Sequence, residues 1–228
     1  AAEPLFGILP FILTSIYGTA GAILLGVPVG YMTAVFLAKM APPKLKTAVS
    51  AAVSLLAGVP SVVYGLAGML VLVPGIRQVL HIPDGSGLLA AIIVLAIMIL
   101  PLIMRTAEEA LIAVPDSYRE GSFGLGAGRL RTVFRIVLPA AGPGILSGVI
   151  LGIGRIVGET AALIFTAGTM AQIPGLFQSG RTLAIHMYVL SGEALHMNEA
   201  NATAVVLLLV VLLMNTLSAL AAKKLTKK

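Results

Sequence analysis

The sequence predicts an all-α, polytopic membrane protein in which residues 1–228 form a single transmembrane domain with five transmembrane helices. The first observation is composition: 58% of the residues are hydrophobic and 11% are charged, whereas soluble domains have roughly 45–50% apolar and about 25% charged residues. The second is a set of uncharged stretches, each long enough for a helix of about 20 residues that crosses a bilayer. The third is an asymmetric distribution of lysine and arginine between the connecting segments.

The uncharged stretches give the five predicted helices in chain order. They cover residues 4–38, 47–76, 85–104, 136–154 and 200–222. We expect the fourth helix to continue past Arg155 and Glu159 into the apolar residues 160–171. Each predicted helix should therefore be continuous except where helix-breaking residues interrupt it.

Prolines and glycines divide or shape four of these helices. Pro28, Pro60, Pro101 and Pro143 fall inside or at the ends of the predicted spans, and proline removes a backbone hydrogen bond that neighbouring groups or a cavity must replace. The segment Gly58-Val59-Pro60-Ser61 predicts an interruption of the second helix, as in transporters whose pathways are lined by broken helices. The glycines that recur every four residues in the fourth span predict a close packing face, and they are Gly144, Gly148 and Gly152.

The connecting segments predict the orientation in the membrane. With the N-terminus outside and the C-terminus in the cytoplasm, only Arg77 and Arg181 lie on the outer side and Arg155 lies within a span. The other basic residues are then cytoplasmic, as the positive-inside rule requires; they are Lys39, Lys44, Lys46, Arg105, Arg119, Arg129, Arg131, Arg135, Lys223, Lys224, Lys227 and Lys228. An outward N-terminus normally needs an earlier span or signal, so we expect a further N-terminal segment before Ala1.

Composition also excludes several classes of function. The absence of cysteine excludes disulfides, iron–sulfur clusters and thiol catalysis, and the three scattered histidines do not predict a metal site. The formal charge of +6 does not indicate nucleic-acid binding, because the basic residues are separated by long apolar runs and are not interleaved with aromatic residues. Residues 121–128 are rich in glycine but lack the Gly-Lys-Ser/Thr ending of a phosphate-binding loop, so no nucleotide cofactor is expected in this chain.

The segment from about 105 to 139 is the longest cytoplasmic connection and carries polar residues in a fixed arrangement. Pro115-Asp116-Ser117 predicts the start of a short helix that runs to about Leu125 and ends at Gly126 and Gly128. Such a helix can insert into a groove of another protein. The alternative is a solvated amphipathic connector without a partner.

This segment resembles the EAA loop of ATP-binding-cassette (ABC) importer permeases, whose pattern is Glu-Ala-Ala, three residues, Gly, nine residues and Ile-x-Leu-Pro. The matching positions are Glu120, Gly126, Ile136, Leu138 and Pro139, and the departures are Gly121 and Ser122 in place of the two alanines. The resemblance implies a type I ABC-importer permease fold and a coupling role for all seven residues. It also implies a non-catalytic chain, with ATP and Mg²⁺ bound and ATP hydrolysed on a partner ATPase.

The charged pair of the fourth span is the candidate substrate contact. Arg155 and Glu159 lie four residues apart, which on one helix places them on the same face about 6 Å apart along the axis. The Arg155 guanidinium suits the oxygens of a phosphate-type anion, whereas the alternative is a mutual salt bridge that only holds helices together. Thr160 and Ser61 could line the same path, although hydroxyl groups in spans often bond their own helix backbone.

Two further segments resemble the phosphate-importer permeases. They are Ala57-Gly58-Val59-Pro60-Ser61-Val62-Val63-Tyr64-Gly65 and Ile153-Gly154-Arg155-Ile156-Val157-Gly158-Glu159-Thr160-Ala161, and residues 158–168 with Arg181-Thr182-Leu183 are more similar to the PstA type than to the PstC type. The resemblance implies a six-helix family pattern, a bacterial or archaeal cell membrane and import of inorganic phosphate into the cytoplasm.

The partners implied by this resemblance are two ATPase subunits, a second, PstC-like permease and an extracytoplasmic phosphate-binding protein. Two alternatives for the function stay open at this point. One is import of another oxyanion, molybdate or sulfate. The other is a proton-coupled secondary carrier, in which Glu159 would be the proton site and Arg155 its counter-charge.

Overall fold

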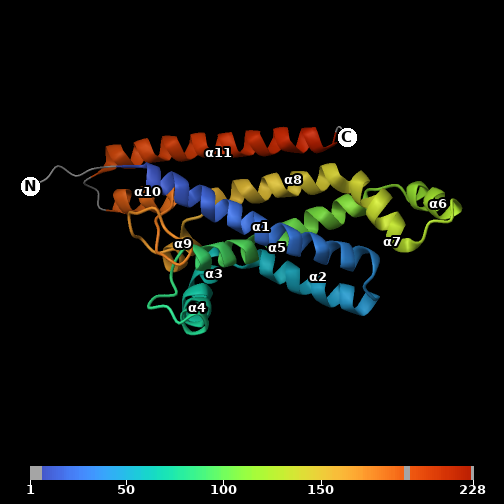
Figure 1. Ribbon diagram of the computed structural model, residues 1–228, viewed down its shortest axis with the longest axis horizontal. Helices are drawn as coiled ribbons and strands as arrows, with labels where there is room; N and C mark the ends of the chain where they lie inside the picture. The colour runs from blue at the N-terminus through green and yellow to red at the C-terminus, as the bar shows by residue number, and fades with distance from the viewer. Residues whose placement is uncertain (1–6, 193–195, 227–228) are drawn as a thin grey trace, which may run out of the picture.

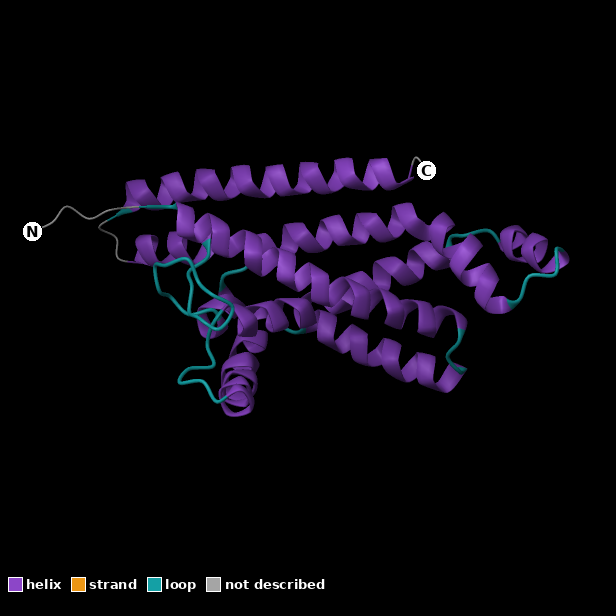
Figure 2. Cartoon of the chain, viewed as in Figure 1, coloured by secondary structure: helices purple, strands orange, loops and turns teal. Residues whose placement is uncertain are grey.

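A computed structural model describes residues 7–192 and 196–226, and within these residues it contains helices and loops but no strand (Figure 2). Residues 4–6 of the first predicted span, and Lys227 and Lys228, lie outside the described residues. In chain order the elements are α1 (Leu9–Lys39), α2 (Pro43–Gly58), α3 (Ser61–Ala67), the π-helical segment η1 (Gly68–Leu72), α4 (Val73–Leu80), α5 (Leu88–Ile112), α6 (Asp116–Gly124), α7 (Arg129–Thr132), the π-helical segment η2 (Val133–Val137), α8 (Leu138–Val157), α9 (Ala161–Thr166), α10 (Leu183–Gly192) and α11 (Met197–Thr226).

Five helical runs of the described chain are long and apolar enough to cross a membrane, which confirms the predicted number. They are Leu9–Ala38, Ser61–Leu80, Leu88–Ile112, Arg129–Val157 and Met197–Leu220. Figure 1 shows α1, α5, α8 and α11 running lengthwise through the molecule. We call the end that holds α6 and α7 the α6 end and the opposite end, which holds α9 and α10, the α9 end.

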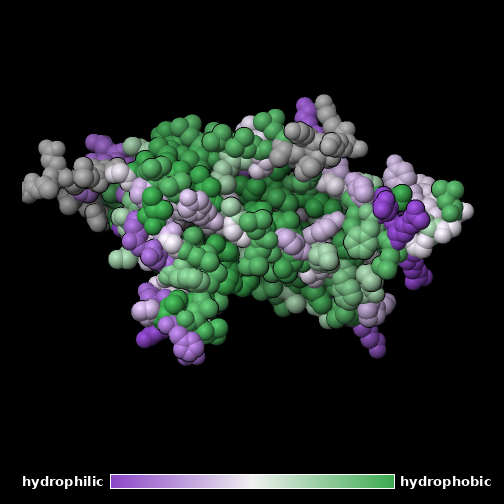
Figure 3. All heavy atoms as spheres, viewed as in Figure 1, coloured by the Kyte–Doolittle hydropathy of each residue, from purple (hydrophilic) through white to green (hydrophobic). Residues whose placement is uncertain are grey.

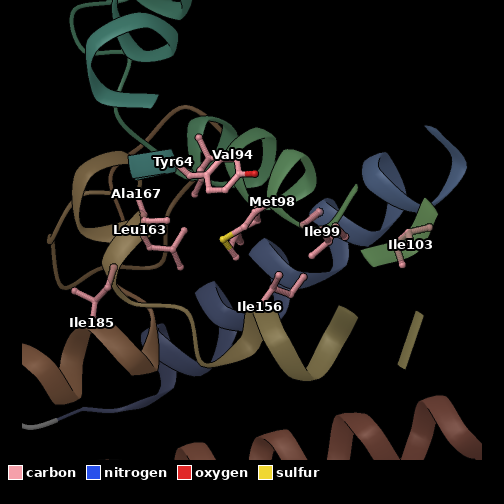
Figure 4. Close-up of a cluster of buried hydrophobic side chains, with 13 residues drawn as sticks. Tyr64, Val94, Met98, Ile99, Ile103, Ile156, Leu163, Ala167 and Ile185 are labelled. Atoms are coloured by element: carbon pink, nitrogen blue, oxygen red, sulfur yellow. The ribbon is translucent and has the colours of Figure 1, made fainter. Parts of the chain in front are cut away.

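Helix α5 lies at the centre of the bundle, packed against α1 on one side and α8 on another. The close approach of α8 depends on its glycines: a Cβ at Gly144 would lie 2.6 Å from the Ala110 side chain, and one at Gly148 would overlap Thr106. The small-residue face predicted for the fourth span is therefore confirmed, and it packs on α5. Side chains of α3, α5, α8 and α9 form the main core, among them Tyr64, Met98, Ile99, Ile156 and Leu163 (Figure 4).

The predicted interruption of the second span is confirmed. Helix α2 ends at Gly58, Val59 and Pro60 are extended, and a new helical run begins at Ser61. The 47–76 stretch is therefore not one transmembrane helix, and the span is the run Ser61–Leu80. Across the break, the Tyr64 hydroxyl donates a hydrogen bond of 2.7 Å to the Leu56 carbonyl, which lies in the last turn of α2. The same carbonyl also accepts the Val59 N–H at 3.1 Å, so the tyrosine hydroxyl adds a side-chain link across the break.

The fourth span differs from its prediction, because it ends at Val157 and does not continue through Glu159 into 160–171. The chain turns at Gly158, and α9 begins only at Ala161. The physical reason is local: the Glu159 carboxylate accepts a hydrogen bond of 3.1 Å from the Ala162 N–H, which satisfies a donor at the start of a separate helix. Arg155 and Glu159 consequently do not share one helix face.

On the face that Figure 3 shows, hydrophobic residues cover much of the middle of the bundle and hydrophilic residues gather toward its two ends. Helix α11 exposes an unbroken row of leucines, including Leu208, Leu209, Leu212 and Leu213, each more than half exposed. A soluble protein rarely exposes so large an apolar surface, whereas a bilayer covers it. The chain is therefore a multi-pass membrane protein.

Candidate translocation and coupling sites

The two helix breaks lie beside each other at the candidate substrate site. A Cβ at Gly65 would meet Ala162 and the Phe165 ring, and one at Gly68 would meet Thr166. From Gly65 to Gly68 the neighbouring residue moves forward along the chain, from Ala162 to Thr166. The helices α3 and α9 therefore run parallel, and their N-termini lie on the same side. Figure 1 shows the two helices adjacent. Ser61 and Thr160, predicted from two separate spans, are therefore both placed at neighbouring helix starts.

Arg155 lies in the last turn of α8 and its side chain is exposed. Within residues 7–192 and 196–226 its guanidinium forms no ion pair, and the salt bridge to Glu159 considered as an alternative does not occur there. Tyr64 of α3 lies within electrostatic range of this charge. Arg155 and Glu159 thus lie in separate segments, on either side of Gly158, and form no ion pair with each other.

The start of α3 adds a second group that favours anions. Ser61 is the first residue of the run to Leu80, and no side chain caps this N-terminus. An uncapped helix start carries unpaired N–H groups and a partial positive charge. At the other break, the Thr160 hydroxyl lies 3.4 Å from the Gly158 carbonyl, a weak contact with its own backbone. Two positively charged groups are thus present, the full charge of Arg155 and the partial charge at the start of α3.

The hydrogen bond between the Glu159 carboxylate and the Ala162 N–H can be tested by mutation. Replacing Glu159 with glutamine keeps an oxygen that can accept the Ala162 N–H, whereas alanine removes it. We expect Glu159→Ala to lower the free energy of unfolding by about 1 kcal/mol, the usual cost of losing a helix cap, and Glu159→Gln to stay close to wild type. Thermal unfolding of the purified protein in detergent measures both, and equal losses would show that the charge stabilises the fold rather than the hydrogen bond.

The short helix predicted after Pro115 is confirmed as α6. It runs from Asp116 to Gly124, and Gly126, two residues later, has a positive φ of 78°. The Ala127 N–H bonds the Ser122 carbonyl at 3.1 Å and the Gly126 N–H bonds the Phe123 carbonyl at 2.9 Å. This is the Schellman arrangement, which needs a residue that tolerates the left-handed conformation. Glycine at 126 therefore stops the helix and turns the chain toward α7.

Four of the seven residues predicted to couple to the ATPase line one hollow at the α6 end, namely Gly121, Ser122, Gly126 and Ile136. This hollow, of about 470 Å³, is lined by residues of α6 and of the segment before α8, among them also Arg131. The Ser122 hydroxyl lies 2.8 Å from that of Thr132, so the serine found in place of an alanine fastens α6 to α7. Glu120 is exposed on α6, and Leu138 and Pro139 begin α8 without lining the hollow.

A contact cluster near the α9 end was not predicted from the sequence. The buried His186 ring of α10 stacks on Phe11 of α1 with centroids 3.9 Å apart, and its Nδ1 lies 3.3 Å from Arg181 Nη1. Burial and then the Arg181 charge lower the pKa of His186 to about 4, so the ring is neutral at physiological pH. Arg181 also donates to the Thr169 carbonyl at 2.9 Å. The cluster therefore holds the long loop after α9 against α1 and α10.

Comparison with known proteins agrees with this architecture. Residues 26–228 match the family model described as the binding-protein-dependent transport system inner membrane component. The inward-facing MetNI methionine ABC transporter superposes with a TM-score of 0.73, at 21% sequence identity and 99% coverage of both chains. The predicted fold class, a type I ABC-importer permease, is confirmed.

Three curated relatives share more sequence. The probable ABC transporter permease protein YqgH of Bacillus subtilis is 37% identical over 95% of this chain and 70% of its own. The phosphate transport system permease protein PstC of Xylella fastidiosa is 36% identical over 91% of this chain and 71% of its own. The phosphate transport system permease protein PstA 1 of Mycobacterium tuberculosis is 39% identical over 68% of this chain and half of its own. The chain belongs to the family of binding-protein-dependent transport system inner membrane components.

Proposed function

We propose that this chain is the membrane permease subunit of an ABC importer that moves inorganic phosphate into the cytoplasm. The observation that carries the proposal is Arg155, an exposed guanidinium without an ion pair in the described chain, whose charge acts on Tyr64 in the uncapped helix α3. Guanidinium presents a planar fork of donors that matches phosphate oxygens. The relatives named as phosphate permeases, 36% and 39% identical, support the choice of phosphate among oxyanions.

The orientation follows from the distribution of charge over the two ends. The α6 end carries Lys44, Lys46, Arg129, Arg131 and Arg135, whereas Arg77 and Arg181 lie toward the other end. Under the positive-inside rule the α6 end is cytoplasmic, which places the N-terminus of α1 outside and the C-terminus of α11 inside. Coupling to a cytoplasmic ATPase requires the same orientation, since α6 must project into the cytoplasm.

The chain itself supplies the pathway and the coupling helix rather than the catalysis. ATP, Mg²⁺ and the hydrolytic step would belong to partner ATPase subunits that bind α6 and the hollow beside it. A second permease and an extracytoplasmic phosphate-binding protein would complete the complex. The PstA-type assignment stays a prediction, because the relatives include permeases of both names.

The alternatives differ in what they leave unexplained. A proton-coupled carrier would need Glu159 beside Arg155, but the Glu159 carboxylate caps α9 and the family is one of binding-protein-dependent transporters. Import of molybdate or sulfate fits the same positively charged groups, because these anions offer similar oxygens. Competition between labelled phosphate and unlabelled molybdate or sulfate distinguishes these substrates.

Uptake of radiolabelled phosphate by the reconstituted complex tests the proposal. Proteoliposomes would contain this chain, the second permease and the ATPase subunits, with the binding protein outside. We expect ATP-dependent accumulation of phosphate that unlabelled phosphate blocks and that molybdate or sulfate in tenfold excess leaves largely intact. Accumulation of labelled molybdate or sulfate in place of phosphate would assign the other substrate, and uptake without ATP would indicate a secondary carrier.

The coupling role of α6 gives a separate prediction. Glu120 is exposed on α6 and forms no ion pair within the described chain, so its removal should leave the fold of this subunit intact. We expect Glu120→Ala to reduce recovery of the ATPase subunits with the tagged permease by about tenfold, which corresponds to about 1.4 kcal/mol of binding free energy. Glu109→Ala, at an exposed acidic residue of α5, is the matched control. Full recovery with the Glu120 variant would contradict the coupling role.

A further inference from the structure

Arg119 of α6 connects the exposed coupling helix to the buried end of the central helix. Its Nη1 donates to the Asp116 carboxylate at 2.8 Å, one turn earlier on α6, and the two side chains form an ion pair. Its Nη2 donates to the main-chain carbonyl oxygen of Leu111 at 3.2 Å. Leu111 lies in the last turn of α5, and its side chain is fully buried in the core at the α6 end. One guanidinium therefore bridges two helices.

The Leu111 carbonyl is a suitable acceptor for a positive group. The last four carbonyls of a helix have no partner within it, and they carry the negative end of the helix dipole. A guanidinium at this position satisfies one such carbonyl and opposes the dipole charge. The third nitrogen of the guanidinium, Nε, is buried and has no hydrogen-bond partner among the described residues. The contacts to Asp116 and Leu111 are thus the ones that set the position of this side chain.

Few other links hold α6 to the rest of the molecule. The helix buries none of its own residues in the core, and the Ser122 hydroxyl contacts Thr132, at the start of the helical run Arg129–Val157, rather than α5. The chain between α5 and α6 is only Ala113, Val114 and Pro115 long. The Arg119 bond is therefore the side-chain link by which a displacement of α6 reaches α5 directly.

We propose that Arg119 is a positioning residue that transmits movement of α6 to α5 during ATP-driven transport; this rests on the proposed function, because it assumes that an ATPase moves α6. Helix α5 packs against α1, α2, α8 and α9, so a displacement of its end reaches the spans that position Arg155. A flexible link would let the ATPase move α6 without moving the pathway. Arg119 opposes this, because its guanidinium donates to both Asp116 of α6 and Leu111 of α5.

The first measurement is the amount of phosphate taken up per ATP hydrolysed in the reconstituted complex. In Arg119→Gln we expect this ratio to fall about tenfold, within the usual range of coupling between sites, while the subunits still co-purify and ATP is still hydrolysed. Arg119→Lys keeps the charge without the fork and should give an intermediate ratio. Arg129→Gln, at an exposed arginine of α7 with the same change of charge, should match wild type.

The second measurement reports on the link itself and needs no transport. The chain has no native cysteine, so nitroxide labels at Ile112→Cys and Leu125→Cys, both exposed positions, give a distance between the ends of α5 and α6. Pulsed electron paramagnetic resonance in lipid nanodiscs should give a narrow distance distribution with Arg119 and a broad one with Arg119→Gln. If the glutamine variant does not fold, Arg119→Lys provides the same comparison.

The two measurements distinguish failure of this inference from failure of the proposed function. An unchanged ratio together with an unchanged distance distribution overturns the role of Arg119. A broad distribution with an unchanged ratio also overturns it, because the link would then be structural only. If the wild-type complex takes up no phosphate, the proposed substrate is wrong, and the distance distribution decides whether Arg119 fixes α6 on α5.

Discussion

Replacement of Arg155 by alanine is expected to reduce phosphate uptake by about 100-fold while the complex still assembles. The arginine is exposed and makes no ion pair in the described chain, so its removal breaks no ion pair of the permease. A hydrogen bond to a charged group contributes about 1.5–3 kcal/mol, and every 1.4 kcal/mol corresponds to about a tenfold change in affinity. Loss of a bidentate contact to phosphate therefore accounts for an effect of this size.

The assay compares initial rates of labelled phosphate uptake in proteoliposomes, with subunit recovery and ATP hydrolysis measured on the same preparations. Arg155→Lys keeps the charge but not the planar fork, and we expect it to retain more uptake than alanine and less than arginine. Arg129→Ala, at an exposed arginine outside the pathway, should transport at the wild-type rate. Normal uptake by Arg155→Ala would show that the guanidinium does not contact the substrate.

The fold could be predicted to a large extent because a bilayer leaves few choices. Lipid cannot hydrogen-bond to backbone groups, so long uncharged stretches must become helices. Each of the five predicted spans overlaps one of the five long apolar helical runs. The break at Pro60 was also predictable, since proline lacks the N–H that continues a helix. The coupling helix could be predicted in detail, because Pro115 at its start and Gly126 at its end act locally.

The end of α8 could not be predicted from apolar periodicity, because residues 160–171 are as apolar as the span before them. The signal that was available is Gly158 followed by Glu159 and Thr160, a helix-stopping residue followed by residues that can start a new helix. A second helix so close to the first is possible only because α9 packs on α3, and no local pattern encodes that contact. The role of Tyr64 in fastening α2 to α3 depends on the same tertiary arrangement.

Replacement of Gly65 by alanine is expected to separate α3 from α9 and to lower the free energy of unfolding by about 1–3 kcal/mol, the usual cost of overpacking a core. Gly65 is buried, and a Cβ there would lie 2.8 Å from the Ala162 Cα and 2.9 Å from its carbonyl oxygen. Both atoms belong to the backbone, so the strain cannot be relieved by turning a side chain. One of the two helices must move.

The matched control is Gly58→Ala at the end of α2, where nothing lies within 4 Å of the added Cβ. Alanine is the better helix former, so this variant should be as stable as wild type or more stable by up to about 1 kcal/mol. Thermal unfolding in detergent compares the two. Because α3 and α9 hold the neighbouring helix starts in place, we also expect Gly65→Ala to lower uptake although it leaves Arg155, Ser61 and Thr160 unchanged. Wild-type stability of Gly65→Ala would mean that the two half-helices are not in contact, and the shared site at their starts would then have to be abandoned.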